Sequence, residues 1–190
     1  SGTTSRPKRV PLAHGNLAAS VGNIVETYRL TPEDVSFCIM PLFHVHGLVA
    51  STLATFASGG TVVVPPRFNA LNFWRVAQQY EITWYTAVPS MHQALLSRAK
   101  GRQETAELAN LRFVRSCSAS LPPATMLELE ELFGVPVLEA YGMTEASHQM
   151  SSNPLPPGER VPGSVGRGTG MDVAIMDEGG ALQPSGIRGE

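Results

Sequence analysis

The sequence predicts an α/β fold, with layered sheets covered by helices on both faces, and three observations support this class. Short apolar or β-branched runs alternate with segments whose apolar residues recur at helical spacing. Hydrophobic residues make up 43% of the chain and charged residues 16%, which is typical of a globular protein and too apolar for a disordered one. The sequence contains no internal repeat. We therefore expect βαβ units, whose ligands bind beyond the carboxyl ends of the strands.

The first four elements alternate between helix and strand. Residues 17–28 are expected to form a helix, because their apolar residues follow a helical period. After a turn that contains a proline, the apolar run 35–40 is typical of a buried strand. Residues 48–56 predict a helix that is closed by Gly59-Gly60. The β-branched run 61–64, followed by two prolines, predicts the next strand.

The middle of the chain continues this alternation. A helix is expected over residues 73–80 and a strand over residues 82–85, followed by a helix that begins near Pro89. The apolar run 111–116 predicts another strand. Pro122-Pro123 open the next helix, because proline suits the first helical turn.

The last third contains two expected strands and a long loop. The strands cover residues 135–138 and 171–176, and the stretch 151–170, rich in Pro, Gly and Ser, is expected to be the loop. Long ordered loops in compact α/β chains tend to be functional or to cross between subdomains. Because ligands bind at the carboxyl ends of the strands, the candidate chemistry lies in three further loops. These are the loops after Met40, Ser116 and Leu138.

Charge and cysteine content narrow the function classes. A formal net charge of −2 indicates no surface for acidic lipid or nucleic acid, so we expect no nucleic-acid partner. Cys38 and Cys117 are too few for a disulfide framework and match a reducing compartment. No apolar run approaches the ~20 residues of a membrane span. We expect a cytoplasmic protein, or a peroxisomal one if the parent is eukaryotic, in an oligomeric state that the sequence leaves open.

Two loops contain groups suited to a nucleotide. Residues 1–8 combine hydroxyls, a glycine and Lys8, which supply hydrogen-bond donors and one mobile positive charge for phosphates. The spacing of a Walker loop is absent, so a P-loop NTPase is not expected. In the stretch 139–145, Tyr141 offers a flat face for a base and Glu145 a hard oxygen for Mg²⁺. Taken singly, the first loop equally fits a flexible, solvated terminus, and the second fits a strand-end turn with a solvated acid.

These two loops occur in order with a third motif, Pro41-Leu42-Phe43-His44-Val45-His46-Gly47. Together the three motifs resemble the adenylate-forming superfamily of acyl-CoA synthetases, luciferases and peptide-synthetase adenylation domains, and the resemblance covers essentially the whole chain. It implies that a substrate carboxylate attacks the ATP α-phosphate, giving an acyl-adenylate and pyrophosphate, and that the acyl group then passes to coenzyme A. It also implies that residues 1–190 are the central portion of the AMP-binding domain, without its N-terminal part and the mobile C-terminal domain. Such a fragment is expected to be inactive alone.

By motif match, the resemblance assigns roles to individual residues. The loop over the β- and γ-phosphates contains Ser1, Gly2, Thr3, Thr4 and Lys8. Ala119 and Ser120 lie beside adenine, and Tyr141 stacks on adenine, with Gly142 in the same motif. Thr144 contacts the α-phosphate, and Glu145 binds Mg²⁺. The candidate catalytic residues are Lys8, His44, Thr144 and Glu145. Ser5 and Arg9 stand where the superfamily loop usually has glycine. Ser5 restricts the loop, and Arg9 either adds a second cation near the phosphates or is solvated.

The acid-binding pocket is expected at His44, Ser118 and His148, where loops converge around the hydroxyl-rich stretch 116–120. Imidazole and hydroxyl donors satisfy a second carboxylate, whose burial without a partner is costly, so they favour a short diacid. His44 is common in the superfamily whatever the acid, so it discriminates little. His46 is interpreted as a hydrogen-bonded structural histidine.

The diacid hypothesis agrees with a narrower resemblance. The segments 4–8, 115–121 and 141–154 resemble the oxalyl-CoA synthetase branch of the superfamily. We therefore expect an oxalate–CoA ligase that uses ATP, Mg²⁺ and coenzyme A as co-substrate. Two alternatives stay open: a ligase for medium-chain or aromatic acids, which needs an apolar tunnel, and an ATP-binding module without turnover. The presence of Lys8 and Glu145 argues against the second.

Overall fold

The computed structural model describes residues 8–100 and 108–190, and it confirms the predicted α/β class. Its strands are β1 (Val35–Phe37), β2 (Thr61–Val63), β3 (Trp84–Ala87), β4 (Phe113–Ser116), β5 (Val137–Met143), β6 (His148–Ser152) and β7 (Arg167–Gly168). They form one seven-stranded sheet in the order β2-β1-β3-β4-β5-β6-β7. The strands from β2 to β5 are parallel, whereas β6 and β7 pair antiparallel at the other edge.

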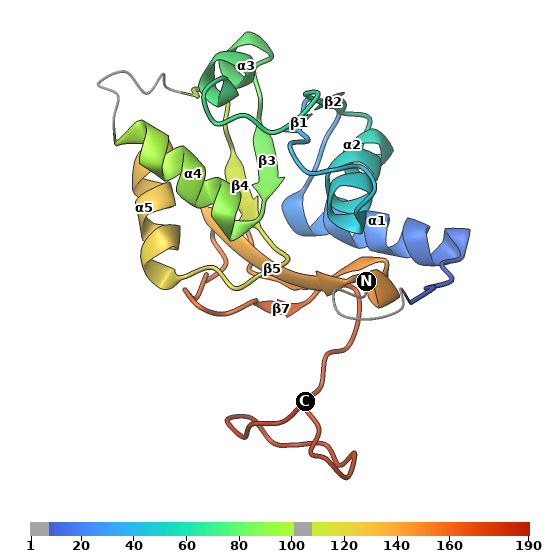
Figure 1. Ribbon diagram of the computed structural model, residues 1–190. Coiled ribbons are helices and arrows are strands. Elements are labelled where there is room, and N and C mark those ends of the chain that lie inside the picture. The colour runs from blue at the N-terminus through green and yellow to red at the C-terminus, as the bar shows by residue number, and fades with distance from the viewer. Residues whose placement is uncertain (1–7, 101–107) are drawn as a thin grey trace.

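Helices cover both faces of the sheet (Figure 1). One face is covered by α1 (His14–Tyr28), the π-helical segment η1 (His46–Leu53) and α2 (Ala54–Ala57), and the other by α3 (Phe73–Gln79), α4 (Pro89–Ala99) and α5 (Pro123–Phe133). A 3₁₀ turn, η2 (Thr144–Ala146), joins β5 to β6. Among the described helices, none combines the length and the apolar character needed to cross a membrane.

The alternation of side chains along β3 separates two hydrophobic cores. Trp84 lies in the core under α1, where its ring stacks on Phe113 at 5.3 Å and Phe113 stacks on Tyr28 at 5.2 Å. Tyr85, the next residue, lies in the core under α3 to α5 and meets Phe73 edge-on. Period-2 alternation in a strand produces this division, and each fully buried large side chain contributes roughly 1.5–3 kcal/mol. Both layers of helices are therefore fixed to the sheet by burial.

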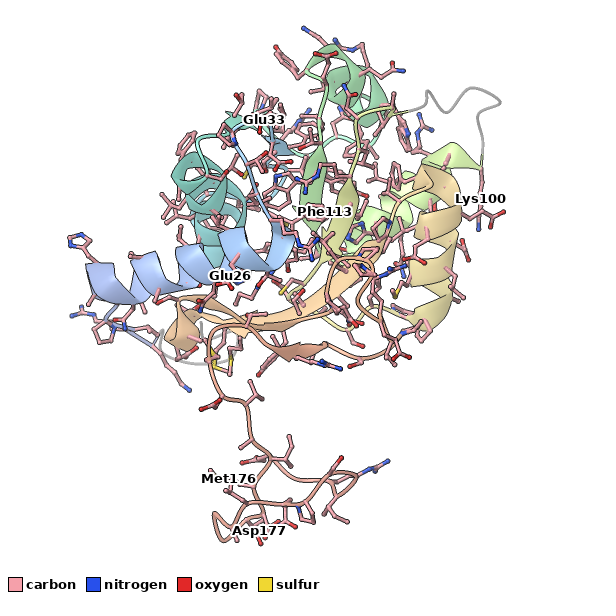
Figure 2. All side chains as sticks on the ribbon, turned by 180° about the vertical axis from the view of Figure 1, so that it is seen from behind. Glu26, Glu33, Lys100, Phe113, Met176 and Asp177 are labelled. Carbon is pink, nitrogen blue, oxygen red and sulfur yellow. The ribbon has the colours of Figure 1, made fainter. Side chains whose placement is uncertain are left out.

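The chain end differs from the sequence prediction. Residues 171–176 are not a strand: Met176 makes an isolated bridge with Leu182, on an arm that extends away from the sheet (Figure 1). Figure 2 shows Met176 and Asp177 on this arm, remote from the helices. Val173 and Ile175 are exposed there, so the apolar run that suggested a buried strand has no sheet to join among the described residues.

Two other expectations were wrong in part. The stretch 151–170, expected to be a loop, contains the end of β6 and all of β7. The polar sequence His148–Ser152 carries no apolar run, yet most of its residues are buried by pairing with β5. The helix expected over residues 48–56 begins earlier and runs as η1 into α2, so that His46 is its first residue.

Candidate functional site

A cavity of about 350 Å³ lies at the carboxyl ends of the parallel strands, where the sequence placed the chemistry. The loop after β1, the start of η1, the loops after β3 and β4, and the β5–η2–β6 turn all contribute to its wall. The lining residues are Met40, His44, Val45, His46, Val88, Ser118, Gly142, Met143, Thr144, Glu145 and His148. A second cavity, of about 320 Å³, lies at the β2 edge against Phe73 and Arg67, and it contains none of the motif residues.

The three predicted acid-binding residues lie together in this cavity. His44 is exposed, with its ring against that of Phe43 at 4.8 Å. Ser118 follows β4 with a left-handed backbone, at φ 72°. His148 opens β6 and is 2% exposed. The fold thus brings residues 44, 118 and 148 to one site, although more than 100 positions separate the first from the last.

The predicted nucleotide residues are placed unevenly. Thr144 and Glu145 line the cavity, and Tyr141 stands beside it on β5 with its side chain 43% exposed. Ala119 and Ser120 are exposed in the loop after β4. Lys8 and Arg9 are exposed at the beginning of the described chain. Ser1, Gly2, Thr3, Thr4 and Ser5 lie outside the described residues.

Gly142 serves the protein's own backbone. A side chain at this position would collide with the carbonyl oxygen of His148, which lies across the β5–β6 pair. The glycine therefore permits the close approach of two strands, in addition to any approach of a ligand. Ser147 and His148 follow with φ of 57° and 119°, a region that side chains rarely adopt. The motif leaves β5 through a 3₁₀ turn and reverses into β6 at His148. Backbone strain of this kind concentrates at functional sites.

Sequence reasoning did not assign a role to Arg115, which lies directly beneath the cavity. Its side chain is on β4 and is completely buried. Its Nε donates to the Tyr28 hydroxyl at 2.8 Å, and its Nη atoms donate to Thr86 Oγ1 at 3.0 Å and to Gln149 Oε1 at 3.0 Å. No carboxylate pairs with Arg115 in the parts of the chain that the structure describes. The available signal was a charged residue inside the apolar run 111–116.

Arg115 also contacts two histidines of the cavity wall. One Nη lies 3.1 Å from His148 Nε2, and the other lies 3.3 Å from His46 Nε2. The two imidazoles stack with their centroids 5.2 Å apart. His46 is buried and further bonded to Thr86 and Ser118, as its structural interpretation requires.

The environment keeps both imidazoles neutral. Burial, and after it the positive charge of Arg115, lowers the pKa of His148 well below its usual value. The same two causes, in the same order, lower the pKa of His46. The part of the cavity wall around His148 therefore presents two neutral imidazoles and the Ser118 hydroxyl, with a buried guanidinium behind them.

The acidic part of the cavity offers a single carboxylate. Glu145 is exposed at the cavity and makes no ion pair with another described residue. The described residues contain no cluster of three or more His, Cys, Asp or Glu that would hold a metal by itself. This donor set fits Mg²⁺, which is usually held by one or two carboxylates together with substrate phosphates rather than by a full protein cage.

A family model described as AMP-binding enzyme matches residues 1–190. The chain belongs to the AMP-binding enzyme family. The resemblance to adenylate-forming acyl-CoA synthetases is therefore confirmed. Oxalate–CoA ligases from Arabidopsis thaliana and Saccharomyces cerevisiae are 53% and 50% identical to it over its whole length.

The solved structures agree with the sequence relatives. The ATP-bound crystal structure of MatB from Rhodopseudomonas palustris matches 98% of the chain with a TM-score of 0.86 at 33% identity. The chain covers 37% of the Arabidopsis enzyme, 34% of the yeast enzyme and 36% of MatB. It thus spans about a third of the length of these relatives.

Proposed function

We propose that this chain is the central portion of the AMP-binding domain of an AMP-forming acid–CoA ligase whose acid is oxalate. The observation that carries the proposal is the cavity at the strand ends, where Ser118 and His148 lie above a buried arginine that has no carboxylate partner in residues 8–100 and 108–190. A site with hydrogen-bond donors and an uncompensated positive charge suits an acid with a second carboxylate. The two oxalate–CoA ligases at 53% and 50% identity support the same acid.

The first half-reaction forms an acyl-adenylate. One carboxylate oxygen of the acid attacks the α-phosphorus of ATP, and the bond from that phosphorus to the pyrophosphate oxygen breaks. The protein's task is to hold the carboxylate and the phosphate in line and to stabilise the charge that develops. Thr144 and the acid-binding side chains line the same cavity, which supports one site for the reacting carboxylate and the α-phosphate. We assign Lys8 to the β- and γ-phosphates and Tyr141 to the adenine ring.

The second half-reaction forms the thioester. The sulfur of coenzyme A attacks the acyl carbonyl, the bond to the AMP oxygen breaks, and the thiol proton leaves to solvent or base. We assign this step to groups of the mobile C-terminal domain together with the domain described here. Glu145 is the residue that would hold Mg²⁺, which supplies charge neutralisation on the phosphates when bound.

The chemistry of the wall distinguishes the acid classes. A medium-chain or aromatic acid requires an apolar tunnel, and two buried imidazoles that stack on each other and contact a buried guanidinium are costly neighbours for such a chain. Acid-dependent ATP–pyrophosphate exchange by the full-length parent tests this directly, with oxalate, malonate, sulfoacetate, hexanoate and benzoate as acids. We expect the highest kcat/KM for oxalate. Preference for hexanoate or benzoate would refute the diacid proposal, and exchange with none of the acids would favour an ATP-binding module without turnover.

The cysteines bear on the compartment of the parent protein. Cys38 and Cys117 are both buried and unpaired, as expected in a reducing environment. We propose a cytoplasmic parent, or a peroxisomal one in a eukaryote. Fractionation of cells expressing the full-length protein tests this placement.

A further inference from the structure

Arg115 is a whole positive charge sealed inside the protein without a counter-ion among residues 8–100 and 108–190. Among the described residues its hydrogen bonds go to two imidazoles, two hydroxyls and an amide oxygen, and the Cys117 side chain also interacts with it. An ionised group held in this way normally requires an opposite charge nearby, because its desolvation costs several kcal/mol. A ligand anion bound in the cavity above Arg115 would compensate this charge.

The donors of Arg115 determine which ring nitrogen of each neighbouring histidine carries the proton. A guanidinium has donors and no acceptor, so His148 Nε2 must accept from it. His46 Nε2 lies 3.3 Å from Arg115 Nη1, which can only donate, so this nitrogen is also an acceptor. The Thr86 hydroxyl, which accepts from Arg115 at 3.0 Å, then donates to His46 Nε2 at 2.6 Å. Because both histidines are neutral, each carries its proton on Nδ1.

These protons are directed at the cavity wall. His46 Nδ1–H donates to Ser118 Oγ at 3.0 Å, which leaves the hydroxyl proton of Ser118 available for a ligand. His148 Nδ1–H has no partner among the described residues, and it is not one of their fully buried unsatisfied atoms. Since His148 lines the cavity, its free donor opens toward that space. Arg115 thus makes two hydrogen-bond donors available to the cavity, the Ser118 hydroxyl and His148 Nδ1–H.

We propose that Arg115 is the positioning residue that selects an acid with a second anionic group, by fixing His46 and His148 as Nδ1–H tautomers and by supplying the positive charge behind them. The inference rests on the proposed function, because it concerns the acid pocket of that same reaction. The ligand class is a short acid with a carboxylate or sulfonate next to its reacting carboxylate. Arg115 acts through the histidines and does not contact the acid.

Oxamate provides the sharpest probe, because it has the shape of oxalate with one carboxylate replaced by a neutral amide. In the full-length parent, Arg115→Met should lower kcat/KM for oxalate by about 10- to 100-fold, as loss of a charge-assisted contact does. The value for oxamate should change by less than about threefold, as should the KM for ATP, so the oxalate-to-oxamate ratio should fall about tenfold or more. Arg115→Lys, which keeps the charge, should restore part of the ratio. An unchanged ratio in Arg115→Met would overturn the proposal.

Arg112→Met is the matched control. Arg112 lies three positions earlier, pairs with Asp34, and does not line the cavity. Its replacement removes an arginine and an ion pair, so stability should fall while the oxalate-to-oxamate ratio stays that of the wild type. An equal fall of the ratio in both variants would show that general loosening, rather than the charge of Arg115, sets the preference.

A measurement on the unaltered enzyme keeps the proposal testable even if Arg115→Met does not fold. In full-length protein labelled with ¹⁵N-histidine, His46 and His148 should show protonated Nδ1 and unprotonated Nε2. A protonated Nε2 at His148 would overturn the inference. If the wild type prefers malonate, the oxalate assignment fails, and malonate against malonamate then tests Arg115. Preference for a simple monocarboxylate would overturn both proposals.

Discussion

Replacing His148 tests the acid pocket most directly, because this residue is buried and lines the cavity. His148→Ala removes the Nδ1–H donor that we assign to the unreacting carboxylate of oxalate. One hydrogen bond to a charged group is worth roughly 1.5–3 kcal/mol, or about 10- to 150-fold in kcat/KM. The guanidinium of Arg115 keeps its bond to Gln149 Oε1 in the variant, so the change does not leave that nitrogen without an acceptor. The loss should therefore appear mainly in the acid-dependent kinetics.

The backbone at position 148 adds a second, independent expectation. With φ at 119°, this residue occupies a region that glycine adopts readily and alanine does not. His148→Gly removes the same ring as His148→Ala but relieves the strain, which is on the order of 1–3 kcal/mol at such positions. The two variants should lose oxalate activity equally, while His148→Gly should be the more thermally stable of the two.

The assay is oxalate-dependent pyrophosphate exchange by the full-length parent, with thermal unfolding measured alongside. His14→Ala is the control, because His14 is exposed at the beginning of α1 and does not line the cavity. ATP binding should be unchanged in all three variants, since Thr144 and Glu145 remain. Oxalate activity within about twofold of the wild type in both His148 variants would refute the assignment of this donor to the acid, because such a change is about 0.4 kcal/mol.

Four further expectations follow from residues described above. Glu145→Gln in the full-length parent should lower adenylation on the order of 10²-fold by removing a metal ligand, and near wild-type exchange across a Mg²⁺ titration would exclude that role. The 190-residue chain alone should form no acyl-CoA from oxalate, ATP, Mg²⁺ and coenzyme A, and measurable thioester would show that the essential groups lie within it. Asp34→Ala should lower the free energy of unfolding by about 2–4 kcal/mol, because the buried carboxylate accepts hydrogen bonds from Arg112, Thr83 and a backbone N–H. Lys100→Ala removes an exposed ion pair and should cost less than about 1 kcal/mol, so equal melting temperatures of the two variants would contradict this expectation. Burial lowers the pKa of His92 from 6.5 to about 4, so between these pH values the unfolded chain binds a proton that the folded chain does not. The contribution of His92 to the free energy of unfolding should be fully present above about pH 6.5 and fall by about 1.4 kcal/mol per pH unit toward pH 4, and a melting temperature that rises on acidification would be the contrary result.

The parallel half of the sheet was predictable because its signals are local. Apolar runs such as 61–64 and 111–116 contain the strands β2 and β4, and the proline pair at 122–123 marks the start of α5 within a residue. The antiparallel edge was not, because the residues of β6 are polar and are buried only through pairing with β5. The strand predicted over residues 171–176 was wrong for the opposite reason, since this run is apolar but its side chains remain exposed.

The site was predictable where a side chain itself faces the cavity. His44, Ser118, Thr144, Glu145 and His148 could be placed there from their motifs and the order of the loops. The layer beneath them could not, because its contacts join β3, β4, β6 and α1 across the fold. No spacing in the sequence indicates that a hydroxyl on α1 and an amide on β6 meet one guanidinium.

The junction at Tyr28 has a consequence for how such a pocket changes in evolution. Its hydroxyl accepts from Arg115 Nε at 2.8 Å and donates to Gln149 Oε1 at 2.9 Å, and Gln149 in turn accepts from Arg115. Replacing Tyr28 leaves Arg115 Nε without its described partner in a dry interior, at a cost of about 1–3 kcal/mol. The other atoms of the triangle each keep a second described partner, such as Ser152 Oγ for the Tyr28 hydroxyl and His148 Nε2 for Arg115. A change of the buried charge beneath the pocket therefore involves a residue of the first helix.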